Sequence, residues 1–101
     1  MAKKLKPTNA VKGAATEYGR RAVTNRSKQK KLLKDRSELP AMRQLGIDAA
    51  ERDTSAARNS IKSAVQFASN AGATMPQIAS AYYRGAVKGV VKGAVQNMRN
   101  R

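Results

Sequence analysis

The side chains best suited to chemistry in this sequence are basic, and they gather toward its two ends. Lysine and arginine at such density match the footprint expected for phosphate contacts, because each neutralised phosphate releases bound counterions. We therefore expect these side chains to bind a polyanion. The candidates are Lys3, Lys4, Lys6, Arg20, Arg21, Arg26, Lys28, Lys30, Lys31 and Lys34 near the N-terminus, and Lys88, Lys92 and Arg99 near the C-terminus.

The signal for charge is strong, whereas nothing in the sequence indicates that bases are read. No segment has the spacing of a zinc finger, a recognised helix-turn-helix signature or an aromatic ribonucleoprotein motif. The expected partner is therefore nucleic acid, DNA or RNA, bound without sequence preference, or protein subunits of a large assembly beside it.

Residues that could support catalysis are scarce. The chain has no Cys and no His, and its clustered carboxylates, Asp48, Glu51 and Asp53, fall near the start of a predicted helix, where acids complement the helix dipole. No phosphate-binding glycine loop, no serine with a plausible base and no set of metal ligands is present. We assign no catalytic residue, metal site or cofactor, and the chain is predicted not to be an enzyme.

Charge divides the 101 residues unevenly. The net charge is +15, of which residues 1–34 carry +10, residues 35–58 carry −1 and residues 59–101 carry +6. We predict a basic N-terminal arm or helix over residues 1–34, followed by a helical region over residues 35–101. No apolar run follows the basic start of the chain, so no signal peptide is expected.

Apolar spacing predicts helices throughout, and the fold class is therefore all-α. Small and apolar side chains recur at helical intervals from Val11 to Ala22, which predicts a helix over residues 9–34. Its second half, from Arg26 to Lys34, is cationic nearly all round. We expect that half to become helical when its charge is neutralised.

The middle of the chain is predicted to hold a short helix and then a longer one. Ser37 can cap a helix that Gly46 would end, and Asp48 can cap the next helix, over about residues 48–69. Asp53 interrupts the apolar stripe of that longer helix. It is expected to pair with neighbouring Arg52 or Arg58 or with another chain, or to face solvent.

Thr74 and Gln77 have the spacing of a capping box, with Pro76 in the first turn, which predicts a last helix over about residues 75–98. The helices over residues 48–69 and 75–98 are separated by a few residues. We therefore predict that they form an antiparallel hairpin.

Three glycines at four-residue intervals mark the last helix. Gly85, Gly89 and Gly93 each cost about 1 kcal/mol relative to alanine inside a helix, which indicates compensation by close approach of another helix. We predict a helix-packing interface formed by these glycines with Val87 and Val91, either within the hairpin or against a neighbouring subunit.

The last helix also has an apolar face, from Tyr83 to Met98, beside a face that carries Lys88, Lys92 and Arg99. Three interpretations stay open: a face packed on the core, a protein interface beside a polyanion, and a membrane-surface helix. The apolar face consists of Val and Ala rather than Trp, Phe and Leu, so the third is the weakest.

The Met-Ala-Lys-Lys start, the long Lys- and Arg-rich helices, the Ala- and Gly-rich hairpin and the absence of Cys and His resemble the small internal or tail-associated virion proteins of tailed bacteriophages. The resemblance is compositional. It implies a multi-copy helical component of the virion, near the portal, the core or the packaged genome. Two alternatives are a cytoplasmic ribosomal or other ribonucleoprotein accessory protein and a membrane-active cationic peptide.

Overall fold

The computed structural model describes residues 6–37 and 39–100, which form three helices and no strand. α1 spans Pro7–Lys34, α2 spans Pro40–Asn70 and α3 spans Met75–Arg99. The all-α class predicted from the sequence is confirmed. Within the described residues, no helix combines the length and the apolar character needed to cross a bilayer.

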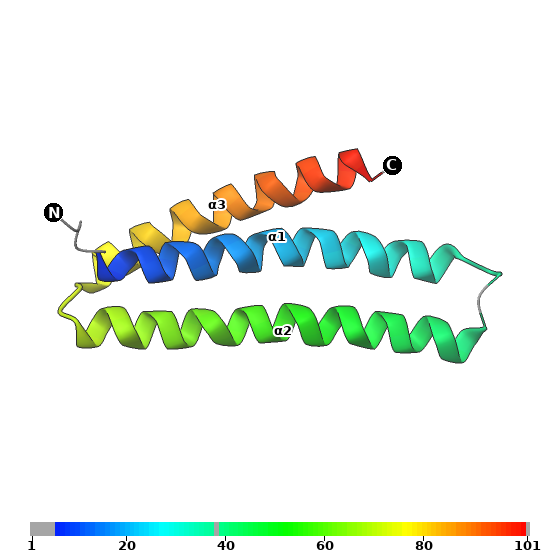
Figure 1. Cartoon of the computed structure of the whole chain (residues 1–101), viewed down its shortest axis with the longest axis horizontal. Coiled ribbons are helices and arrows are strands. Elements are labelled where there is room, and N and C mark those ends of the chain that lie inside the picture. Colours follow the sequence, from blue (N-terminus) through cyan, green and yellow to red (C-terminus); the bar gives the residue numbers. More distant parts are fainter. Residues whose placement is uncertain (1–5, 38, 101) are drawn as a thin grey trace, which may run out of the picture.

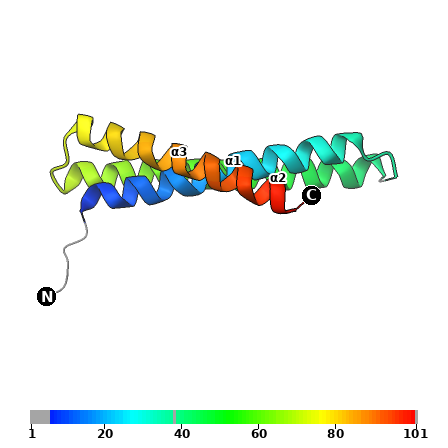
Figure 2. The same cartoon turned by 90° about the horizontal axis from the view of Figure 1, so that it is seen from above.

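α1 lies between the other two helices, with α2 on one side and α3 on the other (Figure 1). α2 runs antiparallel to α1, since Gln29 donates a hydrogen bond to the carbonyl of Ile47 at 3.1 Å and Asn25 bonds to Thr54 farther along α2. α3 runs parallel to α1 and crosses it obliquely (Figure 2). The helices form an elongated body of 55 × 26 × 25 Å.

The two helices expected to form a hairpin do follow one another through a short connection, residues 71–74. They contact one another little, however, and each packs mainly on α1. The reason lies in the small-residue surface of α3, which is matched by Ala15 and Gly19 of α1. The helix contact predicted for the glycines is therefore made with α1 and not, as one of the two predicted possibilities had it, within the hairpin of α2 and α3.

The predicted boundary between a short helix and a longer one is wrong. α2 is continuous from Pro40 to Asn70, its N-cap is Leu39 rather than Ser37, and it passes through Gly46 without a break. Gly46 is accommodated because the side chain of Leu32, on α1, packs against it. A Cβ atom added there would lie 2.8 Å from Leu32 Cδ1.

The connection between α2 and α3 follows the sequence signals closely. Gly72 has a φ of 94°, in the left-handed region that glycine adopts without steric cost, and α2 ends just before it. The backbone amide of Thr74 donates a hydrogen bond to Gln77 Oε1 at 2.9 Å, which is the reciprocal half of a capping box. The predicted stop of α2 and start of α3 are both confirmed.

The apolar core is small and lies at the end of the molecule where α1 begins and α2 and α3 meet. Val11, Ala68 and Ile78, one from each helix, form its buried centre. Partly buried residues around it are mostly alanine. Complete burial of a Val or Ile side chain contributes about 1.5 to 3 kcal/mol, so this core alone stabilises the fold modestly.

Toward the other end, α1 and α2 are joined by polar side chains. Asn25 is buried and donates hydrogen bonds of 2.9 Å to both Asp53 Oδ2 and Thr54 Oγ1. Arg21 donates to the second oxygen of Asp53 at 3.2 Å. Asp53 therefore pairs with α1, and neither Arg52 nor Arg58, the neighbours considered from the sequence, is its partner in these contacts.

Backbone contact joins α3 to α1. Gly85 packs on the carbonyl of Lys12 and Gly89 on that of Thr16, where an added Cβ atom would overlap the carbonyl oxygen. A Cβ atom on Gly93 would lie 2.9 Å from the carbonyl oxygen of Arg20. The contacts advance in the same direction along both helices, so glycine is needed at all three places for α3 to lie this close to α1.

Candidate nucleic-acid interface

Two adjoining clefts form where the second half of α3 passes the middle of α1. The first, of about 360 Å³, is lined by Arg20, Arg21, Lys28 and Lys31 of α1, together with polar residues of all three helices. The second, of about 440 Å³, lies against α3 and is lined by Lys92 and Arg99 as well as Arg20. We call the two clefts together the basic groove. Arg20, Gln96 and Asn100 line both parts of it.

The close approach of α3 to α1 sets the register that brings these cations together. Arg20 and Gln96 lie on opposite walls, and Arg20 Nη1 donates a hydrogen bond to Gln96 Oε1 at 3.1 Å. Gly93 lies one turn before Gln96 and contacts the Arg20 carbonyl. The glycine contact and the groove are thus parts of one interface.

Glu17 orients the two arginines at the base of the groove. Its carboxylate accepts hydrogen bonds from Arg20 and, at 2.8 Å, from Arg21 Nε. The hydrogen bond from Arg20, and then that from Arg21, lower the pKa of Glu17 from 4.5 to about 2. The acids Glu17 and Asp53 fix the arginines and offset part of their charge, while Lys28, Lys31, Lys92 and Arg99 add charge around them.

The pKa of Glu17 predicts how stability depends on pH. Because the fold lowers this pKa, the ionised carboxylate stabilises the folded state above pH 4.5, and that contribution is lost as the pH falls toward 2. Glu17→Gln should lower the melting temperature at neutral pH. The difference from the unmodified protein should narrow through this acid range in thermal unfolding followed by circular dichroism. A constant difference at every pH would contradict the role of the carboxylate.

The structure separates the other predicted binding residues from the groove. On α1, Arg26, Lys30 and Lys34 are exposed but do not line it, and on α3 the same holds for Lys88. Lys6 lines a different cleft, at the end where α1 and α3 begin. Lys3 and Lys4 lie outside the described residues.

The valines of the predicted packing interface are also separated from its glycines. Gly85, Gly89 and Gly93 are buried against α1, whereas Val87 and Val91 face away from it and are exposed. The interpretation in which the apolar face of this helix packs on the core is therefore wrong. Glycines, rather than the larger side chains, form the contact surface because the α1 backbone leaves no room for a side chain.

Sequence reasoning missed the polar residues that complete the groove. Asn25 and Thr24 of α1 and Gln96, Asn97 and Asn100 near the end of α3 line the first cleft among the cations. Their types alone carry no signal for binding. The one usable hint was position, since Gln96 follows Gly93 by three residues and so lies near the same helix face.

Comparison of the chain with protein-family models, with curated proteins and with solved structures finds no match.

The groove combines hydrogen-bond donors and positive charge with the carboxylate of Asp53 and, on its α3 side, with Val91 and Val95. Guanidinium and ammonium groups are the preferred partners of phosphate oxygens, and amide side chains can add neutral hydrogen bonds to the same oxygens. Among residues 6–37 and 39–100, no three acidic side chains cluster as metal ligands would. This arrangement can hold phosphate groups in place.

Proposed function

We propose that this protein is a non-enzymatic assembly protein that binds nucleic acid through phosphate contacts without reading its sequence. The observation that carries the proposal is the convergence of six cations from α1 and α3 on the basic groove. The groove opens on the molecular surface, so a backbone can lie along it. Its cations suit phosphates, which every nucleic-acid sequence shares.

The overall charge supports the same function. At +15 on 101 residues, the folded protein repels itself unless a polyanion offsets the charge. The last acid of the sequence is Asp53, so α3 presents cations alone. A polyanion therefore stabilises the protein as it binds, because it binds the folded arrangement of these cations.

Docking on a larger protein assembly is the second part of the proposal. Large apolar side chains are exposed around the connection of α1 to α2, where α3 does not reach (Figure 1). They are Leu33, Leu39, Met42 and Leu45. With its composition, the protein fits a multi-copy virion component next to packaged nucleic acid, and a ribonucleoprotein accessory protein is the alternative. Mass spectrometry of purified particles that contain the protein distinguishes the two and gives the copy number.

If the protein binds through phosphates, it should discriminate little among nucleic-acid sequences, and its affinity should depend strongly on the salt concentration. The isolated protein should bind unrelated DNA duplexes and RNA with similar affinity at one salt concentration, because phosphates are common to all of them. The logarithm of the binding constant should fall linearly with the logarithm of the salt concentration. Fluorescence anisotropy titrations measure both properties. A preference of about 100-fold or more for one sequence at fixed salt is outside what phosphate contacts produce and would show base recognition instead.

A further inference from the structure

The outer face of α3 is apolar, although this helix packs on α1 through glycine. Val87 is 48% exposed, Val91 57% and Met98 67%. With Tyr83 and Ala94, these side chains form what we call the valine stripe. At about 100° per residue, the centre of the stripe lies about 160° round the helix from the glycine row. α1 therefore covers the opposite side of α3, and α2 lies beyond α1 (Figure 1), so neither covers the stripe.

A row of cations runs beside the valine stripe for its whole length. It consists of Arg84, Lys88, Lys92 and Arg99, all exposed. The same spacing places this row about 100° round the helix from the centre of the stripe. If α3 lay on a flat surface with the valine stripe against that surface, its cations would therefore project sideways, at about the height of the helix axis.

The charge restricts what can cover the stripe. A second copy of the chain would bring another +15, and its own α3 carries no acid to pair with the row. Nucleic acid satisfies the cations but presents a charged backbone to the valines. The partner must offer a negative surface and an apolar layer side by side, along a straight face rather than in a pocket.

We propose that α3 docks in the plane of an anionic lipid surface. The valine stripe enters the boundary between headgroups and acyl chains, while the basic row meets the lipid phosphates at the side of the helix. Long Lys and Arg side chains reach the headgroup level readily. Valine and alanine insert weakly, so the stripe or the charge alone is insufficient, and binding requires both.

Vesicle co-sedimentation tests this with two pairs of comparisons. Vesicles of phosphatidylglycerol mixed equally with phosphatidylcholine should bind the protein at least about tenfold more tightly than pure phosphatidylcholine vesicles. The double variant Val87→Asn, Met98→Asn, which we call the stripe variant, keeps every charge and changes two side chains of the stripe that do not line the basic groove. It should bind the anionic vesicles at least about tenfold more weakly, because it removes apolar surface from the stripe.

The matched control is Met42→Asn, Leu45→Asn on α2, where the two side chains are 55% and 59% exposed. This control should bind anionic vesicles as the unmodified protein does. Both double variants should keep their helical circular dichroism and their affinity for DNA, which separates this inference from the proposed function.

Three outcomes would overturn the lipid assignment. Equal binding of anionic vesicles by the stripe variant and the unmodified protein would show adsorption by charge alone. Self-association in sedimentation equilibrium that the stripe variant abolishes, without vesicle binding, would assign the stripe to a second copy. A monomer that binds neither vesicle would leave the stripe to a protein partner.

Discussion

Gly89→Ala is expected to lower the free energy of unfolding by about 1 to 3 kcal/mol, and Gly89→Leu by more, because either side chain overpacks the contact of α3 with α1. In an exposed helix the alanine substitution would stabilise instead. At Gly89 the added Cβ atom would overlap the carbonyl of Thr16, which is helical backbone and cannot rotate away. The helices must therefore separate. Urea unfolding followed by circular dichroism measures the loss.

Gly13 supplies the control for this prediction. It is an exposed position in α1, and a Cβ atom added there meets nothing within 4 Å. Gly13→Ala should raise the free energy of unfolding by up to about 1 kcal/mol, which is the ordinary helix-propensity gain. The two substitutions are chemically identical and should have opposite signs. If Gly89→Ala stabilised the protein as well, α3 would not be packed on α1 through its glycines.

Neutralising one cation in each half of the basic groove should weaken DNA binding by about 10- to 30-fold near physiological salt. The variant is Lys28→Gln with Lys92→Gln. Both lysines line the groove, and neither forms an ion pair with another of residues 6–37 and 39–100, so the fold should tolerate their loss. Each lost phosphate contact should also reduce the slope of the salt dependence by about 0.9.

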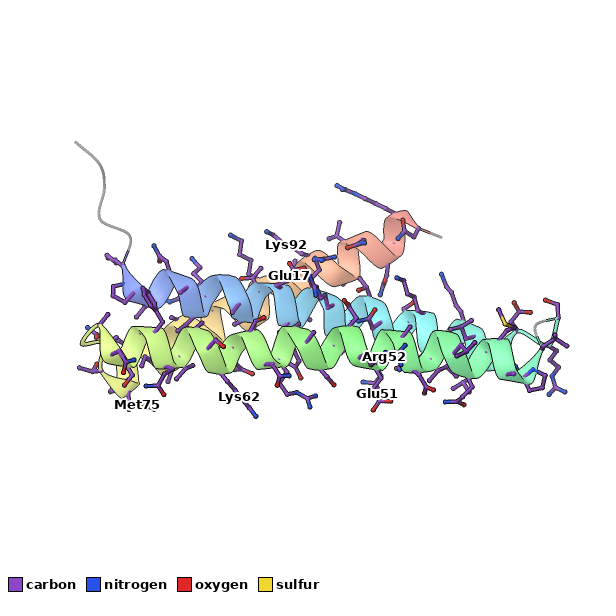
Figure 3. The ribbon with its side chains drawn as sticks, turned by 60° about the horizontal axis from the view of Figure 1, so that its bottom comes forward. Glu17, Glu51, Arg52, Lys62, Met75 and Lys92 are labelled. Carbon is purple, nitrogen blue, oxygen red and sulfur yellow. The ribbon has the colours of Figure 1, made fainter. Side chains whose placement is uncertain are left out.

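A variant of equal net charge distinguishes the groove from the general charge of the protein. Arg52 and Lys62 belong to α2, and Lys62 projects on the side away from the helix that carries Lys92 (Figure 3). Arg52→Gln with Lys62→Gln should reduce the affinity much less than the groove variant does. Equal losses in the two variants would mean that net charge alone governs binding and that the groove has no special part.

The sequence predicted helices well where local signals decide them. Gly72 ends α2 because only glycine takes its backbone conformation at little cost, and Thr74 with Gln77 starts α3 through a local hydrogen bond. Gly46 was misread because the same residue type that ends one helix can sit inside another. What settles its role is Leu32, which lies on a different helix and so leaves no mark in the neighbouring sequence.

The candidate site was predictable in its chemistry and not in its geometry. The sequence shows that the cations are many and that the glycines of α3 need a close neighbour. It does not show that this neighbour is α1. α2 precedes α3 directly in the sequence and is joined to it by a short connection, so α2 is the neighbour that the sequence favours. The choice depends on backbone clearance at positions such as Ala15 and Gly19, which becomes apparent only when the helices are placed side by side.

α3 does not extend to the end of the molecule where α1 ends and α2 begins (Figure 1), so the two ends of the molecule differ in the free energy of local opening. At the end that holds Val11 and Ile78, three helices share a core, whereas at the opposite end the last turns of α1 and the first turns of α2 contact little besides each other (Figure 1). Regions with few buried apolar contacts open at a lower free energy than the global unfolding of a domain. This tip, formed by the last turns of α1 and the first turns of α2, can therefore fray and close again while the glycine contact holds. A partner seated on that tip would lose part of its binding energy to ordering it, and a partner on the basic groove would not.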